Sequence, residues 1–207
     1  MSVQVINALP REVGVAVSGG VDSMVALHFL RQKHQVTAIH FCHAESATAE
    51  AEYAFVAKHC QEHKIPLLLG YQITTRPPGA SREAYWRHDR YQYFHSIRMP
   101  IVTGHHLDDA VEWYLFTAFN GEGYFMEYQN QNVIRPFLGT TKSEIIAYAD
   151  KHCVPFIEDP ANHDPNFAAR NRIRHNILPE VLRVNPGLFK VVKKRVVEKA
   201  KLHKDQP

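Results

Sequence analysis

The sequence predicts an α/β fold, in which a doubly wound parallel sheet is covered by helices and followed by a C-terminal helical extension. Short apolar runs alternate with segments of helical periodicity over the first half of the chain, a pattern typical of parallel strands joined by crossover helices. A glycine pair, Gly19 and Gly20, joins the first apolar run to the first helical segment. The length of 207 residues, 45% of them hydrophobic, suits one domain over 1–182 with a small appendage over 183–207.

Four apolar runs predict the parallel strands. Each run is short, rich in β-branched or other apolar residues, and bounded by polar or turn-forming residues. The predicted strands are Val13–Val17, Gln35–Phe41, Pro66–Gly70 and Ile101–Gly104. No uncharged apolar stretch approaches the roughly 20 residues that a membrane helix requires, so we expect a soluble protein with no membrane partner.

Helical spacing of apolar residues predicts a helix after each strand. These helices are Asp22–Lys33, Ala47–Lys64, Arg82–Ile97 and Leu107–Phe119. A glycine-containing stretch, Asn120–Asn132, follows, and the Thr-Thr-Lys-Ser-Glu sequence at 140–144 has the pattern of a capped helix start. Three prolines predict a long loop over Val154–Asn166, and two more helical patterns close the chain at Ala169–Val184 and Pro186–His203.

Cysteine usage and the N-terminal residues indicate the cellular compartment. The three cysteines, Cys42, Cys60 and Cys153, are odd in number and widely spaced, which argues against a disulfide framework and against a CxxC metal site. The first residues contain no basic segment that leads into an apolar core and a cleavage site. We therefore expect a cytoplasmic protein without a secretory leader.

Basic residues are concentrated near the C-terminus. Between Arg183 and Asp205 the chain has eight lysines and arginines against two acidic residues, which leaves 16 of the 24 basic and 19 of the 21 acidic residues elsewhere. A basic segment of this kind is typical of contact with nucleic acid. A solvated face of a terminal helix is the alternative, because Phe189, Val192 and Val196 recur at helical spacing and supply a face that can dock.

The glycine loop, Ser18-Gly19-Gly20-Val21-Asp22-Ser23, carries the strongest chemical signal. An apolar strand runs through the glycine pair into a helix, so backbone N–H groups and the positive end of the helix converge on a small volume that suits phosphate. The hydroxyl groups of Ser18 and Ser23 add donors for the same anion. The Walker motif and the third glycine of the dinucleotide motif are both missing, and an ordinary tight turn is the alternative interpretation.

A second cluster of polar residues follows the fourth predicted strand. The positions of Asp108, Asp109 and Glu112 are three, four and seven residues beyond His105, so a helix that begins here groups at least three of the four. At the carboxyl end of a parallel sheet this cluster would face the glycine loop. Carboxylates there can hold Mg²⁺, and a histidine can form a hydrogen bond or transfer a proton.

Arginines supply candidate partners for phosphate. Arg87 lies on a predicted helix, and its forked guanidinium suits phosphate oxygens or a departing pyrophosphate. A surface ion pair with Glu83 or Asp89 is the alternative. Three arginines alternate with other residues over 170–174, so one helical turn cannot direct all of them at one ligand, and we predict that Arg172 reaches the site.

These motifs resemble those of the PP-loop, or N-type, ATP pyrophosphatases, whose SGGxDS motif is matched at each position by residues 18–23. Within this superfamily the chain is most similar to the tRNA(Ile)-lysidine synthetase family, from about Val13 to about Pro179. Four further stretches carry the resemblance: Gly79–Tyr91 with its Arg-x-x-Arg-Tyr ending, Thr103–Glu112 with its His-His-x-Asp-Asp sequence, Arg135–Leu138 with Lys142–Ile145, and Glu158–Arg174. Five matches in order make the resemblance specific, although each single motif is weak.

The resemblance implies an adenine nucleotide α-hydrolase-like fold and an ATP-dependent carbon–nitrogen ligase. In this chemistry ATP with Mg²⁺ adenylates the carbon-2 oxygen of a tRNA wobble cytidine, pyrophosphate leaves, and the ε-amine of free lysine displaces AMP. The implied catalytic residues are Asp22, Arg87, His105 and Asp109. The implied nucleotide-binding residues are Ser18, Gly19, Gly20, Asp22 and Ser23. The implied substrate-binding residues are Asp108, Glu112 and Arg172, and the implied Mg²⁺ ligands are Asp22 and Asp109.

The chain also departs from the family pattern. The run Phe41–Ser46 keeps only His43 of the family's Val-Asn-His-Gly-Leu-Arg segment, Trp113 replaces the usual threonine after Glu112, and Asn120-Gly121 replaces Arg-Gly. A short basic helix stands where the family commonly has further tRNA-binding domains. We therefore expect a shortened form of the enzyme that acts as a homodimer or with another component.

Four other functions remain open. A tRNA thiolating enzyme would activate the same kind of carbonyl for sulfur but is expected to have paired cysteines, which this sequence does not show. An amide ligase of NAD-synthetase type shares the glycine loop but does not explain the stretches at 81–91 and 158–174. A metal phosphohydrolase would need the pairs His88-Asp89 and His163-Asp164 to act together, and a catalytically silent nucleotide- or RNA-binding module would explain the altered run at 41–46.

Overall fold

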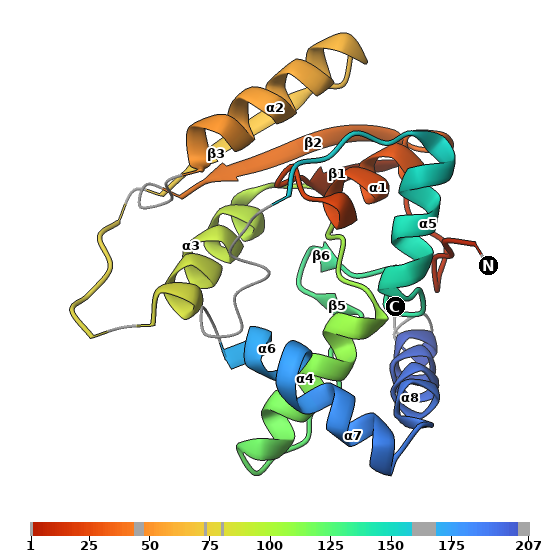
Figure 1. The fold of residues 1–207 in the computed structure, drawn as a ribbon. Coiled ribbons are helices and arrows are strands. Elements are labelled where there is room, and N and C mark those ends of the chain that lie inside the picture. The colour runs from red at the N-terminus through yellow and green to blue at the C-terminus, as the bar shows by residue number, and fades with distance from the viewer. Residues whose placement is uncertain (1, 44–47, 73, 80, 159–168, 203–207) are drawn as a thin grey trace.

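The computed structural model describes residues 2–43, 48–72, 74–79, 81–158 and 169–202, which form a sheet with helices on both of its faces (Figure 1). The sheet has six strands in the order β3-β2-β1-β4-β6-β5. Neighbouring strands pair in parallel except at the edge, where β5 pairs antiparallel to β6. The strands are β1 Glu12–Ala16, β2 Gln35–Cys42, β3 Leu67–Tyr71, β4 Ile101–Val102, β5 Gln129–Asn130 and β6 Val133–Ile134.

The chain order of the strands reverses at β1, which has β2 on one side and β4 on the other. In the register of the sheet, Gly14 lies opposite Thr37 of β2 and Ile101 of β4. Doubly wound folds bind their ligands at such a switch point, in the crevice at the carboxyl ends of the strands. The predicted fold class, a doubly wound and mainly parallel sheet followed by helices, is therefore confirmed.

Helices α1, α2 and α5 pack on one face of the sheet, and α3 packs on the other (Figure 1). Alternate side chains of β2 lie on opposite faces of the sheet. Ala38 belongs to the apolar core that includes α1, whereas Ile39 belongs to the apolar cluster that includes Phe94 of α3. This division follows from the two-residue period of a strand. The helices are α1 Val21–Leu30, α2 Ala49–Glu62, α3 Arg82–Ser96, α4 Leu107–Phe119 and α5 Lys142–His152.

The last helices form a separate layer around α4. Helix α8 (Leu188–Leu202) packs on α4 through an apolar face in which Val192 and Val196 are fully buried. The tail helix is therefore docked, as its apolar spacing predicts. Close to its end, the carbonyl of Ala200 accepts a hydrogen bond from Asn7 Nδ2 at 2.9 Å, which ties the helix to the N-terminal segment. The division of the chain at residue 182 into two domains stays a prediction.

The single helix predicted over Ala169–Val184 has three parts in the structure. These are α6 (Ala169–Arg172), a π-helical segment η2 (Ile173–Ile177) and α7 (Leu178–Val184). Pro179 lies at the start of α7 and has no N–H group to donate to the preceding turn, so a wider turn fits here better than a regular one.

Two other regions differ from expectation. The strands β5 and β6 were not predicted, because each has only two residues and shows no periodicity. The predicted loop over Val154–Asn166 is described as far as residue 158, where it has no regular structure, and its remainder lies outside the described residues. In the described part of the chain, no helix combines the length and the apolar character that a membrane span requires.

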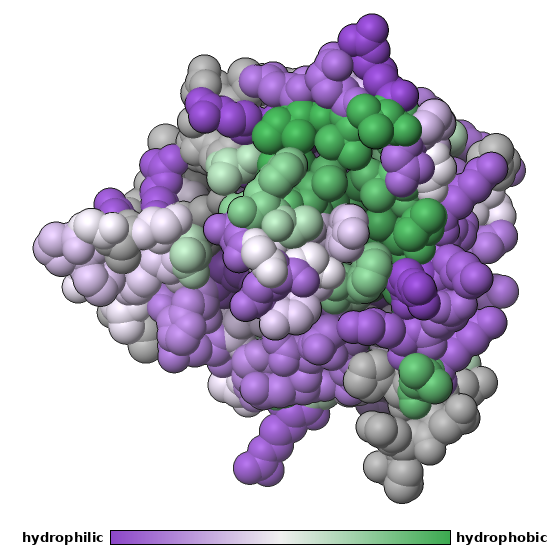
Figure 2. All heavy atoms as spheres, turned by 90° about the horizontal axis from the view of Figure 1, so that it is seen from below, coloured by the Kyte–Doolittle hydropathy of each residue, from purple (hydrophilic) through white to green (hydrophobic). Residues whose placement is uncertain are grey.

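The underside of the molecule, where α4 and α7 lie in Figure 1, carries an apolar area. Figure 2 shows this face, on which apolar side chains gather in one region bordered by polar ones. At the ends of these two helices, Phe119 and Val184 are 62% and 88% exposed. Exposed apolar surface of this kind is a candidate for contact with another protein surface.

Candidate active site

The glycine loop lies between β1 and α1, as the sequence predicts. Gly19 has a φ of +93°, and Gly20 is the N-cap of α1. Ser23 closes the loop, because its Oγ accepts from the Ser18 N–H at 3.1 Å and donates to the Gly20 carbonyl at 2.9 Å. Gly20 offers no side chain to cap the helix, and N–H groups at an uncapped helix start favour a bound anion.

A second glycine brings α4 against this loop. Gly104 follows β4, and a Cβ atom placed on it would lie 2.8 Å from the Asp22 carbonyl oxygen. Only glycine permits this approach of the two backbones. As a result, His106, the N-cap of α4, reaches the side chain of Asp22 in the first turn of α1.

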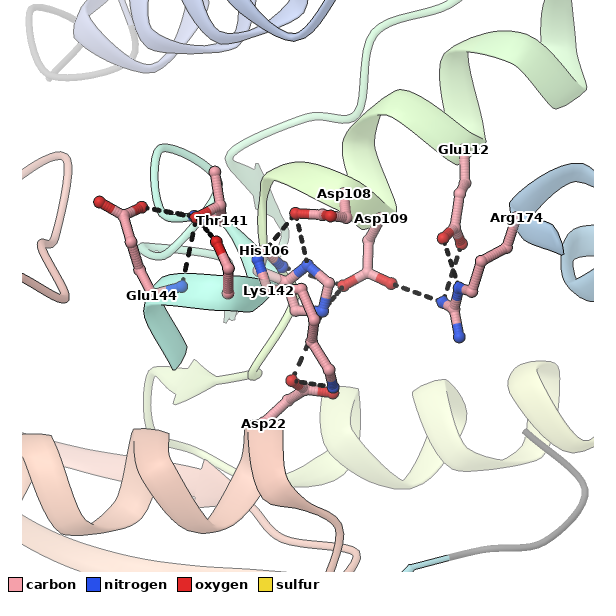
Figure 3. Close-up of polar contacts among 10 residues, drawn as sticks. Asp22, His106, Asp108, Asp109, Glu112, Thr141, Lys142, Glu144 and Arg174 are labelled. Atoms are coloured by element: carbon pink, nitrogen blue, oxygen red, sulfur yellow. Dashed lines mark hydrogen bonds and ion pairs between the residues drawn. The ribbon is translucent and has the colours of Figure 1, made fainter. Parts of the chain in front are cut away.

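His106 lies between two carboxylates (Figure 3). Its Nε2 atom is 3.5 Å from Asp22 Oδ1 and 3.5 Å from Asp109 Oδ2. Its backbone N–H donates to Asp109 Oδ2 at 2.9 Å. The residue is only 2% exposed, so these carboxylates, and not water, decide whether the ring is charged.

The carboxylates keep His106 protonated at neutral pH. Burial alone would lower the pKa of His106, but Asp109, Asp22 and Asp108 raise it to about 9. Burial raises the pKa of Asp109, yet the charge and the backbone N–H of His106 outweigh this effect and hold it well below its usual range. The cluster therefore combines an imidazolium with ionised carboxylates at the switch point of the sheet.

His105, the histidine predicted to be catalytic, does not lie between these carboxylates. Its Nδ1 atom shares a hydrogen bond with Thr103 Oγ1 at 2.8 Å. Burial and nearby arginines lower the pKa of His105 to about 3, although Asp109 opposes them, so the ring is neutral. The role of His105 stays a prediction. His106 was not among the predicted site residues, although its spacing of three residues to Asp109 is a signal that the sequence contains.

Lys142 and Asp108 connect α5 to the site. The Lys142 ammonium donates to Asp22 Oδ1 at 2.6 Å, and the Lys142 backbone N–H donates to Asp108 Oδ2 at 2.8 Å. Thr141 and Glu144 form the capping box that begins α5, as the sequence predicts. Asp108, predicted to bind substrate, thus has an internal contact that orients α5, and Lys142 is a site residue that the sequence did not reveal.

Glu112 is buried on α4, one turn beyond Asp109, and is paired with Arg174 (Figure 3). It is 1% exposed, and it accepts from Arg174 Nε at 2.6 Å and from Nη2 at 3.0 Å. Arg174 Nη2 also lies 3.9 Å from Asp109 Oδ1. Of the alternating arginines, Arg174 thus contacts the acidic residues, a contact that the sequence did not reveal. Arg172 is exposed on α6, and its role in substrate binding stays a prediction.

Arg87 reaches toward the site from α3. Its guanidinium lies 4.9 Å from the centre of the Tyr91 ring and 5.7 Å from that of Trp113. The side chain of Asp89, one alternative partner for Arg87, instead accepts a hydrogen bond from Thr74 Oγ1 at 2.8 Å. A position over aromatic rings leaves Arg87 suitable for an anion that arrives from solution.

Protein side chains alone do not form a metal site at this place. Among the residues that the structure describes, no three His, Cys, Asp or Glu side chains are arranged to hold a metal ion. In the first His-Asp pair that a metal phosphohydrolase would need, His88 is exposed and Asp89 is buried. The other pair, His163 and Asp164, lies outside the described residues.

Comparison with known proteins adds a family relationship to this geometry. Residues 3–181 match the model of the PP-loop domain. The tRNA(Ile)-lysidine synthase of Lactiplantibacillus plantarum is 32% identical over 198 residues, which cover 87% of this chain and 44% of that protein. The synthase of Actinobacillus pleuropneumoniae serotype 3 is 36% identical over 183 residues, or 83% of this chain and 43% of that protein. The chain spans less than half the length of these relatives.

A solved structure has a similar fold. The U34-tRNA thiolase NcsA from Methanococcus maripaludis aligns with a TM-score of 0.70 over 90% of this chain and 72% of that chain. The two sequences are 14% identical in this alignment. At such low identity the likeness shows a shared fold and nothing about the reaction.

Proposed function

Since the chain belongs to the PP-loop domain family, we propose that it is an ATP-dependent ligase that converts the wobble cytidine of a tRNA to lysidine. The observation that carries this proposal is the meeting of the glycine loop with Asp22, His106 and Asp109 at the switch point of the sheet. The lysidine synthases to which the chain is similar support the choice of substrate.

The proposed reaction has two steps. The carbon-2 oxygen of cytidine first attacks the α-phosphorus of ATP, and pyrophosphate leaves. This oxygen, a poor leaving group by itself, is then part of a phosphate ester that can leave as AMP. The ε-amine of lysine then attacks carbon-2, the amine loses a proton, and AMP leaves. The products are lysidine, AMP and pyrophosphate, so this chemistry forms no ADP.

The glycine loop supplies the contacts for the phosphates of ATP. Backbone N–H groups at the start of α1 and the hydroxyl groups of Ser18 and Ser23 all lie on one short segment. Donors that are held in place before the reaction stabilise charge as it develops on departing pyrophosphate. The Arg87 guanidinium would contact the same phosphates from α3.

Mg²⁺ fits the carboxylates beside this loop. The side chains of Asp22 and Asp109 are 34% and 17% exposed and approach each other on either side of His106. In nucleotide-dependent enzymes Mg²⁺ is commonly held by one or two carboxylates together with substrate phosphates. Asp22 and Asp109 would hold the ion, which when bound neutralises charge on the phosphates.

Asp109 is the proposed contact for the ammonium group of lysine. Free lysine, with a pKa near 10.4, is almost wholly protonated at neutral pH. The lowered pKa of Asp109, which the charge and the backbone N–H of His106 maintain against burial, favours an ionised carboxylate that orients an ammonium group. His105 is neutral and offers a ring nitrogen to the amine. The internal contacts of Asp108 and Glu112 favour positioning roles for these two residues.

Helix α8 supplies the proposed contact for tRNA phosphates. A pocket beside the starts of α4 and α5 is lined by Leu107, Thr141, Glu144, Lys190 and Lys193, among others. The basic face of α8 therefore borders the edge of the sheet at which ATP would bind. Lysines at this place would attract the phosphate backbone of tRNA without reading its sequence.

We also propose that the chain acts in the cytoplasm and forms a homodimer. The apolar area on the underside of the molecule (Figure 2) supports a contact between two copies, as do the exposed side chains of Phe119 and Val184 at the ends of α4 and α7. Light scattering would measure the molar mass of the wild type, expected to be that of a dimer, and of Val184→Lys, expected to be shifted toward that of a monomer. A monomeric wild type would contradict it.

Nucleoside mass spectrometry tests the proposed function. Transfer RNA is incubated with the full chain, ATP, Mg²⁺ and lysine, and we expect a nucleoside heavier than cytidine by lysine minus water, with AMP in equal amount. The control is Asp22→Asn, which should keep the circular dichroism of the wild type but form no product. Replacement of oxygen by sulfur would indicate thiolation, stoichiometric ADP would contradict the proposed chemistry, and ATP binding without any product would indicate a silent module.

A further inference from the structure

Two arginines from different helices share one tryptophan beside the acidic residues. The guanidinium of Arg87 in α3 lies 5.7 Å from the centre of the Trp113 ring, and that of Arg170 in α6 lies 5.6 Å from the same ring. Trp113 belongs to α4 and directly follows Glu112. Guanidinium groups at such distances from an indole ring make cation–π contacts.

The positive charges of Arg87 and Arg170 repel each other, so an anion bound between them would be favoured. Burial lowers the pKa of Arg87, Tyr91 opposes this, and the charge of Arg170 lowers it further. The charge of Arg170 also acts on Asp109 and on His105. Trp113 belongs to α4, the helix that carries Asp109 and Glu112, so the two guanidinium groups on its ring lie beside the helix that contributes to the proposed site.

An aromatic ring holds a guanidinium while leaving its donors to a ligand. The guanidinium group is planar, stacks through its face, and directs its N–H groups outward in its own plane. These N–H groups bind the oxygens of phosphate in pairs. The indole of Trp113 can thus fix the place of both charges through contacts with its ring.

We propose that Trp113 is a positioning residue that holds Arg87 and Arg170 together as one anion site for the pyrophosphate part of ATP. This rests on the proposed function, in which pyrophosphate leaves at this edge of the sheet. The arginines would contact the phosphate oxygens, and Trp113 would act through them. Phosphates of the tRNA backbone have the same chemistry, so the test separates the two sources.

Tryptophan fluorescence can report on this site, because the chain has two tryptophans. The variant Trp86→Phe keeps only Trp113. The matched control Trp113→Phe keeps only Trp86, which lies 5.1 Å from the Arg82 guanidinium and stacks on His43. We titrate each variant with Mg²⁺-pyrophosphate, with ATP, and with an anticodon stem-loop RNA in separate experiments. Pyrophosphate and ATP are expected to change the emission of Trp113 far more than that of Trp86.

Calorimetry of pyrophosphate binding tests the role of the ring and of the second charge. Loss of the cation–π contacts in Trp113→Leu, or of one charge in Arg170→Met, should weaken pyrophosphate binding about tenfold. Trp113→Phe keeps an aromatic face and should stay within about threefold of the wild type. The KM for ATP should rise in parallel with this loss, whereas the KM for lysine should not change. A purely structural role would lower the melting temperature and leave the affinity of the folded protein unchanged.

Two results would overturn the proposal. One is an unchanged pyrophosphate affinity in both Trp113→Leu and Arg170→Met, and the other is a Trp113 emission that responds to the RNA alone. Both measurements are independent of turnover, because pyrophosphate binding requires neither lysine nor tRNA. A chain that binds pyrophosphate in this way but forms no lysidine would contradict the proposed function and leave the anion site standing.

Discussion

At the scale of single residues, Gly19 shows how closely the glycine loop is fitted to its surroundings. Its φ is +93°, and a Cβ atom on it would lie 3.0 Å from Ile157 Cδ1. Gly19→Ala should therefore lower the free energy of unfolding by about 1–3 kcal/mol. Because the strain also turns loop N–H groups away from phosphate, we expect ATP affinity, measured by calorimetry, to fall about tenfold or more.

Gly79→Ala is the matched control for this substitution. Gly79 also has a positive φ, +79°, but no described atom lies within 4 Å of the added Cβ. The control carries the conformational cost without disturbing the glycine loop, so its ATP affinity should equal that of the wild type. An equal loss of affinity in the two variants, or no loss in Gly19→Ala, would contradict the assignment of the loop to ATP.

The charge of His106 predicts how stability depends on pH. Its pKa in the folded protein is about 9, against 6.5 for an unperturbed histidine, so protonation favours the folded state. This contribution is fully present below pH 6.5 and is lost as the pH rises toward 9. We expect the wild type to lose on the order of 1–3 kcal/mol of unfolding free energy over this range relative to His106→Gln.

Urea denaturation at pH 6.5 and at pH 9 measures this difference. The exposed residue His88 on α3 provides the control substitution, His88→Gln, which should retain the pH dependence of the wild type. If His106→Gln shows the same loss of stability as the wild type, the imidazolium between the two carboxylates does not exist in solution.

Local sequence patterns predicted some site residues and could not predict others. The glycine loop and the Asp108-Asp109 pair were found because neighbouring positions in the chain define them. Lys142 and Arg174 lie in stretches that carry the family resemblance, but their contacts were not predicted because their partners are far away in sequence: Lys142 is 120 positions from Asp22, and Arg174 is 62 positions from Glu112. Such contacts depend on how the elements pack, which no single segment specifies.

At the scale of secondary-structure elements, the start of α5 links stability to the site. Thr141 caps this helix, and the next residue, Lys142, contacts both Asp22 and Asp108. Thr141→Ala should cost about 1 kcal/mol of unfolding free energy, the usual loss for an N-cap. Because the variant also loosens Lys142, we expect weaker ATP binding, measured by calorimetry beside a thermal melt.

Ser81→Ala is the control at another helix start. Ser81 caps α3 through a bond from the Ala84 N–H at 3.4 Å. This variant should lose stability to a similar or smaller extent and bind ATP as the wild type does. Equal ATP binding by Thr141→Ala and Ser81→Ala would show that the α5 cap has no part in the site.

The element pattern was predictable where an element is long enough to show a period. The ranges predicted for the first four strands and for the helix Leu107–Phe119 agree with the structure to within a few residues. The two-residue strands β5 and β6 and the π-helical segment η2 were not predictable in this way. Their conformations depend on pairing with β4 and on Pro179 rather than on a repeating pattern.

At the scale of the whole molecule, the basic face of α8 is proposed to bind tRNA, whereas its apolar face contributes to stability. Lys190, Lys193, Lys194 and Lys199 are all exposed, and replacing these four by Gln should reduce the slope of log affinity for tRNA against log salt by roughly 3–4. Filter binding over a salt series measures this slope. Melting temperature and ATP affinity should not change, because the apolar face of the helix stays intact.

Two further variants distinguish tRNA binding by α8 from effects of net charge and of stability. Replacement of four exposed lysines elsewhere, Lys33, Lys58, Lys64 and Lys151, controls for net charge and should leave the salt slope nearly as it is. Truncation after Arg183 removes the buried residues Val192 and Val196 and should lower the melting temperature. An unchanged slope in the α8 variant would assign tRNA binding to another surface.

The bond between Asn7 and Ala200 also sets an order for folding as the chain is synthesised. Its partners are 193 positions apart, and Ile6 and Leu9 pack in the same cluster as Ala200. Contacts between neighbouring segments, such as β1 with β2, form early, whereas closure of so long a loop comes late. We therefore expect the part of the sheet that holds the glycine loop to fold on the ribosome first. The N-terminal segment becomes covered only later, after α8 has been synthesised.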